Sequence, residues 1–237
     1  IGLGVTGGLG MLLQADGLAF TSASTSAFLT QFAAVLVPIA VAIRDRRLPP
    51  AYVAMCIGIV IAGEAVLARV DWHDLRLGRG EIETLLGTAF FAGQILWLER
   101  PIFHGNHTGR VTFVMFLVIA ILLSPIVALN SEHPLDFAVL TLRPEIIVLF
   151  VLVTLCCSVV AFLLMNRWQP VVDATTAGII YCAEPVFATF FALFLPALLA
   201  AWMDISYVNE TMTVSLLIGG ALITLANILI ATRSAKV

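Results

Sequence analysis

The chain has 237 residues, of which 61% are hydrophobic and only 11% are charged, and its mean hydropathy is +1.06. A soluble domain carries roughly a quarter charged residues, so this composition excludes an ordinary soluble fold. The net charge of −3 excludes the basic face that binding to nucleic acid requires. The sequence therefore predicts a protein whose surroundings are a lipid bilayer and which has no nucleic-acid partner.

Apolar runs long enough to cross a membrane follow one another along the chain. A hydrocarbon core of roughly 30 Å needs about 20 apolar residues per helix. Such runs lie at residues 1–20, 22–43, 51–69, 82–103, 111–129, 145–166, 173–196 and 212–232. Because runs such as 146–155 lack the alternation of a membrane β-barrel, we expect an all-α integral membrane protein with about eight transmembrane helices.

The charges between these runs predict an orientation. One side has eight basic and three acidic residues, the basic ones being Arg44, Arg46, Arg47, Arg100, Arg110, Arg167, Arg233 and Lys236. The other side has four basic residues (Arg69, Arg76, Arg79 and Arg143) and ten acidic ones. Basic residues favour the cytoplasmic side. We therefore expect a multi-pass protein of the cytoplasmic membrane with its C-terminus in the cytoplasm.

The sequence contains a weak internal repeat. Residues 24–29 (STSAFL) resemble residues 175–180 (TTAGII), and each copy is followed one helix later by a glycine-centred run, at Gly58 and Gly219. Three predicted helices separate the copies, which fits repeats of five helices that face opposite ways in the membrane. We expect the last three helices of a first repeat at 1–69, a complete second repeat at 82–232, and two further helices before Ile1.

Several stretches resemble the EamA-type family of the drug/metabolite transporter superfamily. They are residues 21–24 with 27–30, residues 44–46 after that helix, residues 177–188 (AGIIYCAEPVFA) and the closing residues 219–223. The resemblance covers essentially the whole chain, as helices three to ten of a ten-helix protein. It implies two inverted five-helix repeats, cytoplasmic termini and transport of small metabolites by alternating access.

Glu184 is the most informative ionisable residue, because it lies deep in an apolar run and is followed by Pro185. A carboxylate at the bilayer centre costs on the order of 3 kcal/mol on insertion scales, so it faces protein or water. Pro185 and Pro38 are predicted sites of helix kinks, and Tyr181 lies on the same helical face as Glu184. Two interpretations stay open: a protonatable or cation-facing group with a transport role, or a protonated carboxyl that supports the kink.

The remaining site candidates are polar residues inside apolar runs: Gln31, Thr30, Ser26, Gln94, Glu64 and Asn227. Ser26 and Thr30, with Ser22, form a narrow stripe that either packs tightly or lines a cavity. Glu64 is either an interfacial carboxyl that snorkels to the headgroups or a coupling site. The amides either contact a solute or form interhelical hydrogen bonds. Small residues four apart, at Gly4 and Gly8, Ala174 and Gly178, and Ala188 and Ala192, predict close helix packing.

Together these features predict a secondary transporter of small polar or amphiphilic metabolites, without catalytic residues, metal or cofactor. Its expected partners are a small-molecule solute and the bilayer, with a coupling proton and a second copy of the chain as further candidates. A membrane-embedded enzyme acting on lipid is the rival interpretation, and it needs a cluster of His, Asp or Ser at one depth. A membrane scaffold without transport is the third.

Overall fold

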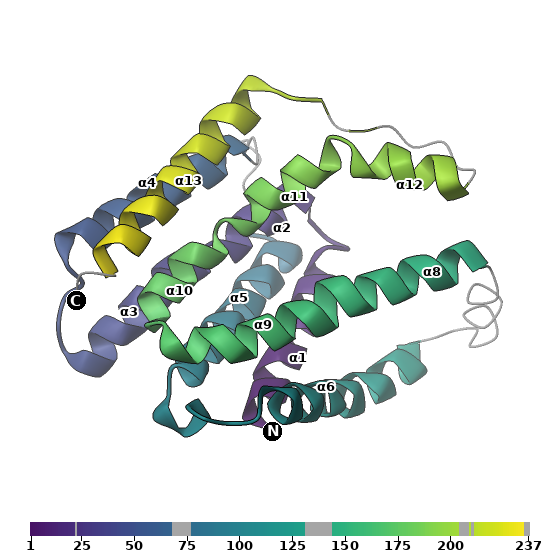
Figure 1. The fold of residues 1–237 in the computed structure, drawn as a ribbon, viewed down its shortest axis with the longest axis horizontal. Helices are drawn as coiled ribbons and strands as arrows, with labels where there is room; N and C mark the ends of the chain where they lie inside the picture. Colours follow the sequence, from purple (N-terminus) through teal and green to yellow (C-terminus); the bar gives the residue numbers. More distant parts are fainter. Residues whose placement is uncertain (22, 68–76, 131–143, 204–208, 210, 235–237) are drawn as a thin grey trace.

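The computed structural model describes residues 1–21, 23–67, 77–130, 144–203, 209 and 211–234 (Figure 1). Within these ranges the chain is helical and has no β-strand. Five helical segments there are long and apolar enough to cross a membrane: Thr25–Asp45, Thr108–Leu129, Ile146–Val171, Ala174–Ala192 and Val214–Thr232. The coarse prediction of a helical membrane protein is therefore confirmed. Several loop charges used for the orientation, among them Arg69, Arg143 and Lys236, lie outside the described residues.

Helices cover all eight predicted runs, and in three of the runs the helix is interrupted or changes type. The helices are α1 (Gly2–Gly17), α2 (Ala23–Thr30), α3 (Ala33–Asp45), α4 (Ala51–Leu67), α5 (Arg79–Leu98), α6 (Thr108–Asn130), α8 (Pro144–Leu152), α9 (Ala161–Trp168), α10 (Ala174–Tyr181), α11 (Glu184–Ala192), α12 (Leu195–Met203) and α13 (Val214–Ser234). A π-helical segment, Val153–Val160, joins α8 to α9. Near the predicted end of a run at residue 196, α11 ends at Ala192, and after a break at Leu193 and Phe194 the chain forms α12 to Met203.

Two of the runs contain a helix break of the same form. The α2–α3 path breaks at Gln31 and Phe32, whose N–H groups donate to carbonyls three residues earlier, at 3.2 and 3.1 Å. The α10–α11 path breaks in the same way at Cys182 and Ala183. Cys182 lies 151 positions after Gln31, and the same separation relates the ends of α2 and α10 and the starts of α3 and α11.

The two predicted kink prolines lie differently with respect to these breaks. Pro185 lies in the first turn of α11, where its missing N–H leaves no gap in the helix. Pro38 lies inside α3 and is buried, more than a turn beyond the break at Gln31. The break in the first path therefore precedes the proline that predicted it.

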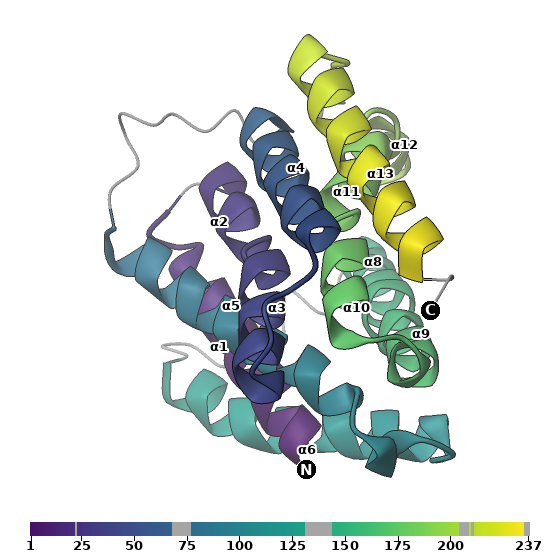
Figure 2. The same ribbon diagram turned by 90° about the vertical axis from the view of Figure 1, so that its left-hand side faces the viewer.

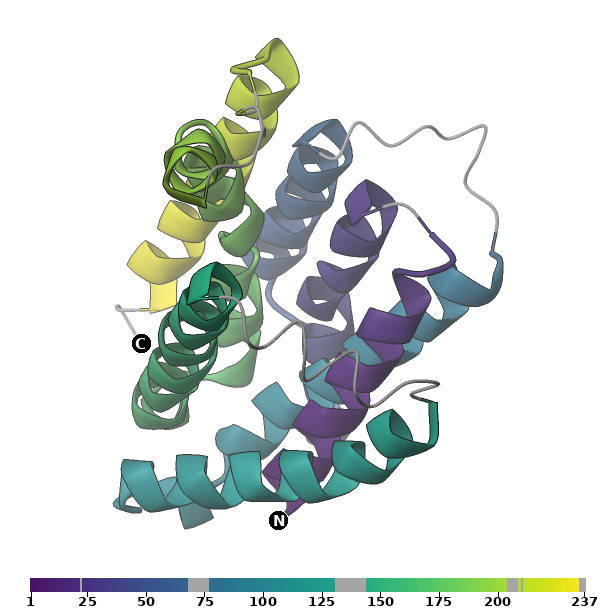
Figure 3. The ribbon, with the colours of Figure 1, turned by 90° about the vertical axis from the view of Figure 1, so that its right-hand side faces the viewer.

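Glycines let α1 lie close to its neighbours α5 and α6 (Figure 3). A Cβ atom at Gly4 would lie 2.7 Å from the Met115 carbonyl oxygen of α6, and one at Gly8 would lie 3.0 Å from the Leu122 side chain. Only glycine permits this approach of the two backbones, which is the arrangement expected for helix association in lipid. The predicted close packing through Gly4 and Gly8 is confirmed.

Helices α4 and α13 also cross in close contact and lie side by side in Figure 1. A Cβ atom at Gly219 would lie 2.7 Å from the carbonyl oxygen of Gly63, and one at Gly63 would lie 3.1 Å from that of Gly219. Gly58, which the repeat pattern paired with Gly219, has no atom within 4 Å of its Cβ position. The crossing is therefore at Gly63, and it places the next residue, Glu64, in the interior.

Polar contacts connect the helix ends into two opposite groups. At the Arg44 end, Arg44 forms an ion pair with Glu99, and Glu99 accepts a hydrogen bond of 3.0 Å from the backbone N–H of Ala174. At the Asp16 end, Asp16 forms an ion pair with Arg79 at 2.6 Å. The Thr21 hydroxyl donates to Glu81 at the same end, and this hydrogen bond holds the pKa of the Glu81 carboxyl below its usual value. These contacts define the Arg44 end and the Asp16 end of the bundle.

Candidate functional site

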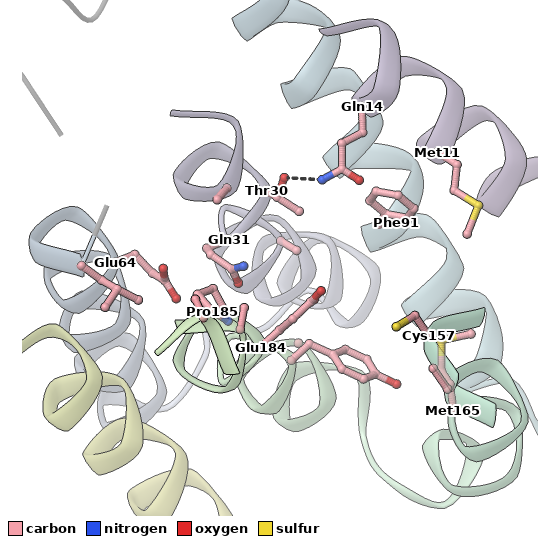
Figure 4. A pocket seen from close by; sticks show the side chains of 18 of the residues that line it. Met11, Gln14, Thr30, Gln31, Glu64, Phe91, Cys157, Met165, Glu184 and Pro185 are labelled. Atoms are coloured by element: carbon pink, nitrogen blue, oxygen red, sulfur yellow. Dashed lines mark hydrogen bonds between the residues drawn. The ribbon is translucent and has the colours of Figure 1, made fainter. Parts of the chain in front are cut away.

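A cavity of about 1400 Å³ lies between the two broken helix paths and the helices around them. Figure 4 shows part of its lining. Its polar lining residues are Gln14, Thr30, Gln31, Glu64, Gln94, Tyr181, Glu184, Asn209, Thr211 and Thr213. Its apolar lining includes Met11, Phe91, Phe162 and Met165. Six of the predicted candidates therefore meet at one site, although they come from five different helices and one helix break.

Glu184 owes its place in the cavity to the second helix break. It is the first residue of α11, directly after the turn at Cys182 and Ala183, and its side chain is exposed to the cavity. In Figure 4 its carboxyl points into the open space on the side of Cys157. An acidic residue in the first turn of a helix also interacts favourably with the helix dipole. The carboxyl therefore borders the cavity, and its contact with protein or water in the membrane stays a prediction.

Glu64 differs from Glu184 in its burial. Its exposed fraction is 1%, and its Oε1 atom has no hydrogen-bond partner among the described residues. Figure 4 shows its carboxyl directed toward Gln31 and Pro185, which border the cavity. The interpretation of Glu64 as a snorkelling interfacial acid is wrong, because the α4–α13 crossing encloses the side chain.

The neutral polar groups near the first break form a short hydrogen-bonded chain. Gln14 Nε2 donates to Thr30 Oγ1 at 3.0 Å, and the Thr30 hydroxyl donates to the Ser26 carbonyl oxygen at 2.9 Å. Gln31 is 7% exposed and lies at the break itself. Sequence reasoning missed Gln14, because it lies near the end of its apolar run, whereas Gln31 and Gln94 lie in the middle of theirs.

A second set of polar contacts lies on the side of the cavity toward the Arg44 end. The Tyr181 hydroxyl donates to Gln169 Oε1 at 3.1 Å, and Gln169 Nε2 donates to the Ile95 carbonyl oxygen at 2.8 Å. Gln94 is 3% exposed, and its Nε2 lies 3.5 Å from the Met115 sulfur. Gln169, which the sequence did not single out, thus joins α5 to α10 through Tyr181.

Two predicted site candidates lie outside the cavity lining, and one pair of residues predicted to pack against a helix lies in it. Ser26 is not among the residues lining the cavity, and its hydroxyl lies 3.4 Å from that of Thr84 in α5. Asn227 Nδ2 donates within its own helix to the Ile223 carbonyl oxygen at 3.0 Å. Ala188 and Ala192, predicted to pack against a helix, line the cavity instead, whereas Ala174 is fully buried as expected.

The cavity is closed toward the Arg44 end and lined by residues near the Asp16 end of the bundle. α3 lies beside α10, whereas α2 and α11 lie apart at the other end of the two broken paths (Figure 2). In the α3–α10 contact a Cβ atom at Gly178 would lie 3.5 Å from that of Val37. At the other end, Leu67 and the residues 209, 211 and 213 belong to the lining. The described lining therefore extends from the α3–α10 contact toward the Asp16 end of the bundle.

The cavity lacks the donor set of a metal site. No group of three or more His, Cys, Asp or Glu in the described part of the chain could hold a metal ion. The chemistry that these residues do provide is two carboxyls, several amides and hydroxyls, and aromatic faces.

Comparisons with known proteins identify the fold but no family. No family model and no curated protein matches this chain. A solved crystal structure described only as "Crystal structure of protein" is similar over 98% of this chain and 77% of its own, with a TM-score of 0.71 and 17% sequence identity. At this identity the likeness shows a shared fold alone.

Proposed function

We propose that the protein is a secondary transporter that moves small metabolites across the cytoplasmic membrane by alternating access. The observation that carries the proposal is the pair of helix breaks, 151 positions apart, that border one cavity. Discontinuous helices in corresponding positions of two halves are the arrangement in which transporters hold substrate near the bilayer midplane. The EamA-type resemblance, eight spans and two inverted five-helix repeats belong to this proposal.

The contact between the breaks supports the inverted repeat. Cys182 Sγ lies 3.9 Å from the Gln31 carbonyl oxygen, so residues in equivalent positions of the two copies touch. A residue touches its own equivalent only where it lies next to the two-fold axis that relates the copies. Such an axis exchanges α2 with α10 and α3 with α11. Applied to the α3–α10 contact, which closes one end, this axis gives an α2–α11 contact, which would close the other end.

The Arg44 end has the features of a closed gate. Val37 is fully buried against Gly178, and Glu99 joins Arg44 of α3 to the start of α10. Alternating access requires that this contact opens while α2 and α11 approach each other.

A reversible cross-link tests this cycle. The Cβ separation of 3.5 Å between positions 37 and 178 falls within the range for a disulfide, about 3.5–4.5 Å. Val37→Cys with Gly178→Cys, in a variant whose four native cysteines are replaced, should transport when reduced and lose at least about tenfold in uptake when oxidised. Uptake is measured by mass spectrometry after reconstituted vesicles are incubated with a mixture of cellular metabolites.

The single variants Val37→Cys and Gly178→Cys serve as controls, and oxidation should leave their uptake unchanged. Equal uptake by the oxidised and reduced double variant would contradict alternating access at this gate. Vesicles in which no metabolite accumulates would contradict transport itself.

A further inference from the structure

The charge of the cavity lining has one sign. Glu64 and Glu184 approach the cavity from different helices, and the described residues of its lining include no Lys, Arg or His. Arg44 and Arg79, which lie at opposite ends of the bundle, are engaged in ion pairs there. An anionic solute would therefore meet two carboxyls without a compensating cation, whereas a cationic solute would be attracted by both.

The unpartnered oxygen of Glu64 independently indicates a ligand that donates hydrogen bonds. A buried acceptor that lacks a partner costs roughly 1–3 kcal/mol, so such atoms are rare in folded proteins. Glu64 Oε1 is such an atom, with its side chain 1% exposed and bordering the cavity. An ammonium group supplies N–H donors and positive charge together, and both satisfy this oxygen.

The rest of the lining fits an organic body better than a bare ion. Phe91, Phe162 and Tyr181 present aromatic rings, and Met11 and Met165 add polarisable apolar surface. Aromatic faces attract cations within about 6 Å of the ring centre. The volume of about 1400 Å³ exceeds what a metal ion occupies, and the described residues contain no metal-ligand group.

We propose that the cavity binds an organic cation, an ammonium group on an apolar or aromatic body, with Glu64 and Glu184 as its two anionic partners. This inference rests on the proposed transport function, because it names the class of solute for the same cavity. Glu184 is accessible from the cavity and receives the ammonium first, and Glu64 receives it beside Gln31 at the break.

Three probes that differ in charge but share one aromatic body test the assignment: phenethylamine, 2-phenylethanol and phenylacetate. Binding to the purified protein in lipid nanodiscs is measured by titration calorimetry. We expect phenethylamine to bind at least about tenfold more tightly than the alcohol or the carboxylate. Equal affinity for the three probes, preference for phenylacetate, or no saturable binding of phenethylamine would overturn the assignment.

Charge-neutralising variants separate the two carboxyls from a general effect of charge. Glu64→Gln and Glu184→Gln should each weaken phenethylamine binding at least about tenfold and leave 2-phenylethanol binding unchanged. Asp45→Asn is the matched control, because Asp45 is an exposed carboxyl outside the cavity. Because Glu184 faces open space, its variant keeps the test decisive even where Glu64→Gln lowers the yield of folded protein.

The same probes distinguish this inference from the proposed function. Phenethylamine binding without uptake into vesicles would support the cation site and contradict transport. Uptake of neutral or anionic metabolites without phenethylamine binding would support transport and contradict the cation site.

Discussion

Two carboxyls share the cavity but differ in how the surrounding residues hold them. Glu184 begins a helix and faces open space, so it can exchange protons or solute without movement of the backbone. Glu64 is enclosed beside the Gly63–Gly219 crossing and keeps one oxygen unpaired. At the scale of single residues, Glu184 is therefore the group best placed to change its protonation state during a transport cycle.

The substitution Glu184→Gln tests this role. The amide keeps the shape of a protonated carboxyl, and the Glu184 side chain is exposed to the cavity. The variant should therefore reach the parental level in the membrane. It should lose proton-driven accumulation but retain exchange at saturating solute, since exchange requires no net proton movement. Uptake with and without an imposed pH gradient, in vesicles of equal protein content, measures both properties.

Glu184→Ala serves as the comparison variant in that experiment. We expect this variant also to reach the membrane, because the break at Cys182 and Ala183 is formed by backbone hydrogen bonds that do not involve the Glu184 side chain. Full accumulation by Glu184→Gln, together with loss of Glu184→Ala from the membrane, would assign the carboxyl to support of the break.

The sequence predicted the charged and mid-run polar residues of the site but not their partners. Glu64, Glu184, Gln31 and Gln94 stand out because a polar side chain in an apolar run is rare and demands a partner. Gln14 and Gln169 do not stand out, because they lie near the ends of runs, where polar residues are ordinary. Ser26 and Asn227 do not line the cavity. The face of α2 that meets the cavity depends on its packing against α5, and that of α13 on its packing against α4.

At the scale of helices, glycines determine where the backbones meet. Apolar composition gives no driving force for helix association in lipid, so close packing through small residues has to supply it. The pattern of glycines predicted close packing at Gly4 and Gly8 but not the partner helix, which is α6. It could not distinguish Gly58 from Gly63 in α4, because both lie in the same apolar run and only the position of α13 separates them.

Substitution of these two glycines in α4 tests the crossing. Gly63→Ala should lower the free energy of unfolding by roughly 1–3 kcal/mol, because the added methyl group forces α4 away from α13. Gly58→Ala, in the same helix, should have no such effect and should favour the helix slightly, by up to about 1 kcal/mol. The thermal midpoints of both variants in the same detergent give the comparison. A midpoint for Gly63→Ala equal to that of Gly58→Ala would show that the crossing contributes nothing.

Helix breaks and the π-helical segment were harder to predict than the runs themselves. Hydropathy reports how apolar a stretch is, and residues 153–160 are equally apolar in an α- or a π-helix. The break at Gln31 has no proline within the following turn, so no local signal marks it. It becomes recognisable only through its counterpart at Cys182, where Pro185 does mark the change of direction.

At the scale of the whole molecule, polar contacts sort the helix ends into two groups that alternate along the chain. The Arg44 end holds the α3–α4, α5–α6 and α9–α10 connections, and the Asp16 end holds the α1–α2 and α4–α5 connections. This grouping agrees with the two loop sets defined from the sequence. The membrane side of each group remains a prediction from the excess of basic residues.

Cysteine labelling tests the orientation at exposed positions. Leu77 and Met212 are 70% and 63% exposed on the predicted outer side, and Leu48 and Ile102 are 91% and 72% exposed on the predicted cytoplasmic side. In a variant without native cysteines, Leu77→Cys and Met212→Cys should react with an impermeant thiol reagent added to intact cells. Leu48→Cys and Ile102→Cys should react only after the cells are opened, and the reverse pattern would invert the assignment.

The contacts of the Glu99 carboxylate affect the rate at which the α3–α10 contact can open. It holds the guanidinium of Arg44 on one helix and the backbone of Ala174 on another, and both side chains of the ion pair are partly exposed to solvent. Ion pairs of this kind contribute only about 0.2–1 kcal/mol, because water competes for both charges. The contacts of Glu99 therefore favour the closed α3–α10 arrangement only weakly and add little to the energy barrier for its opening. Under the proposed function, we expect the speed of the transport cycle to depend on the separation of the apolar surfaces behind these contacts, at Val37 and Gly178.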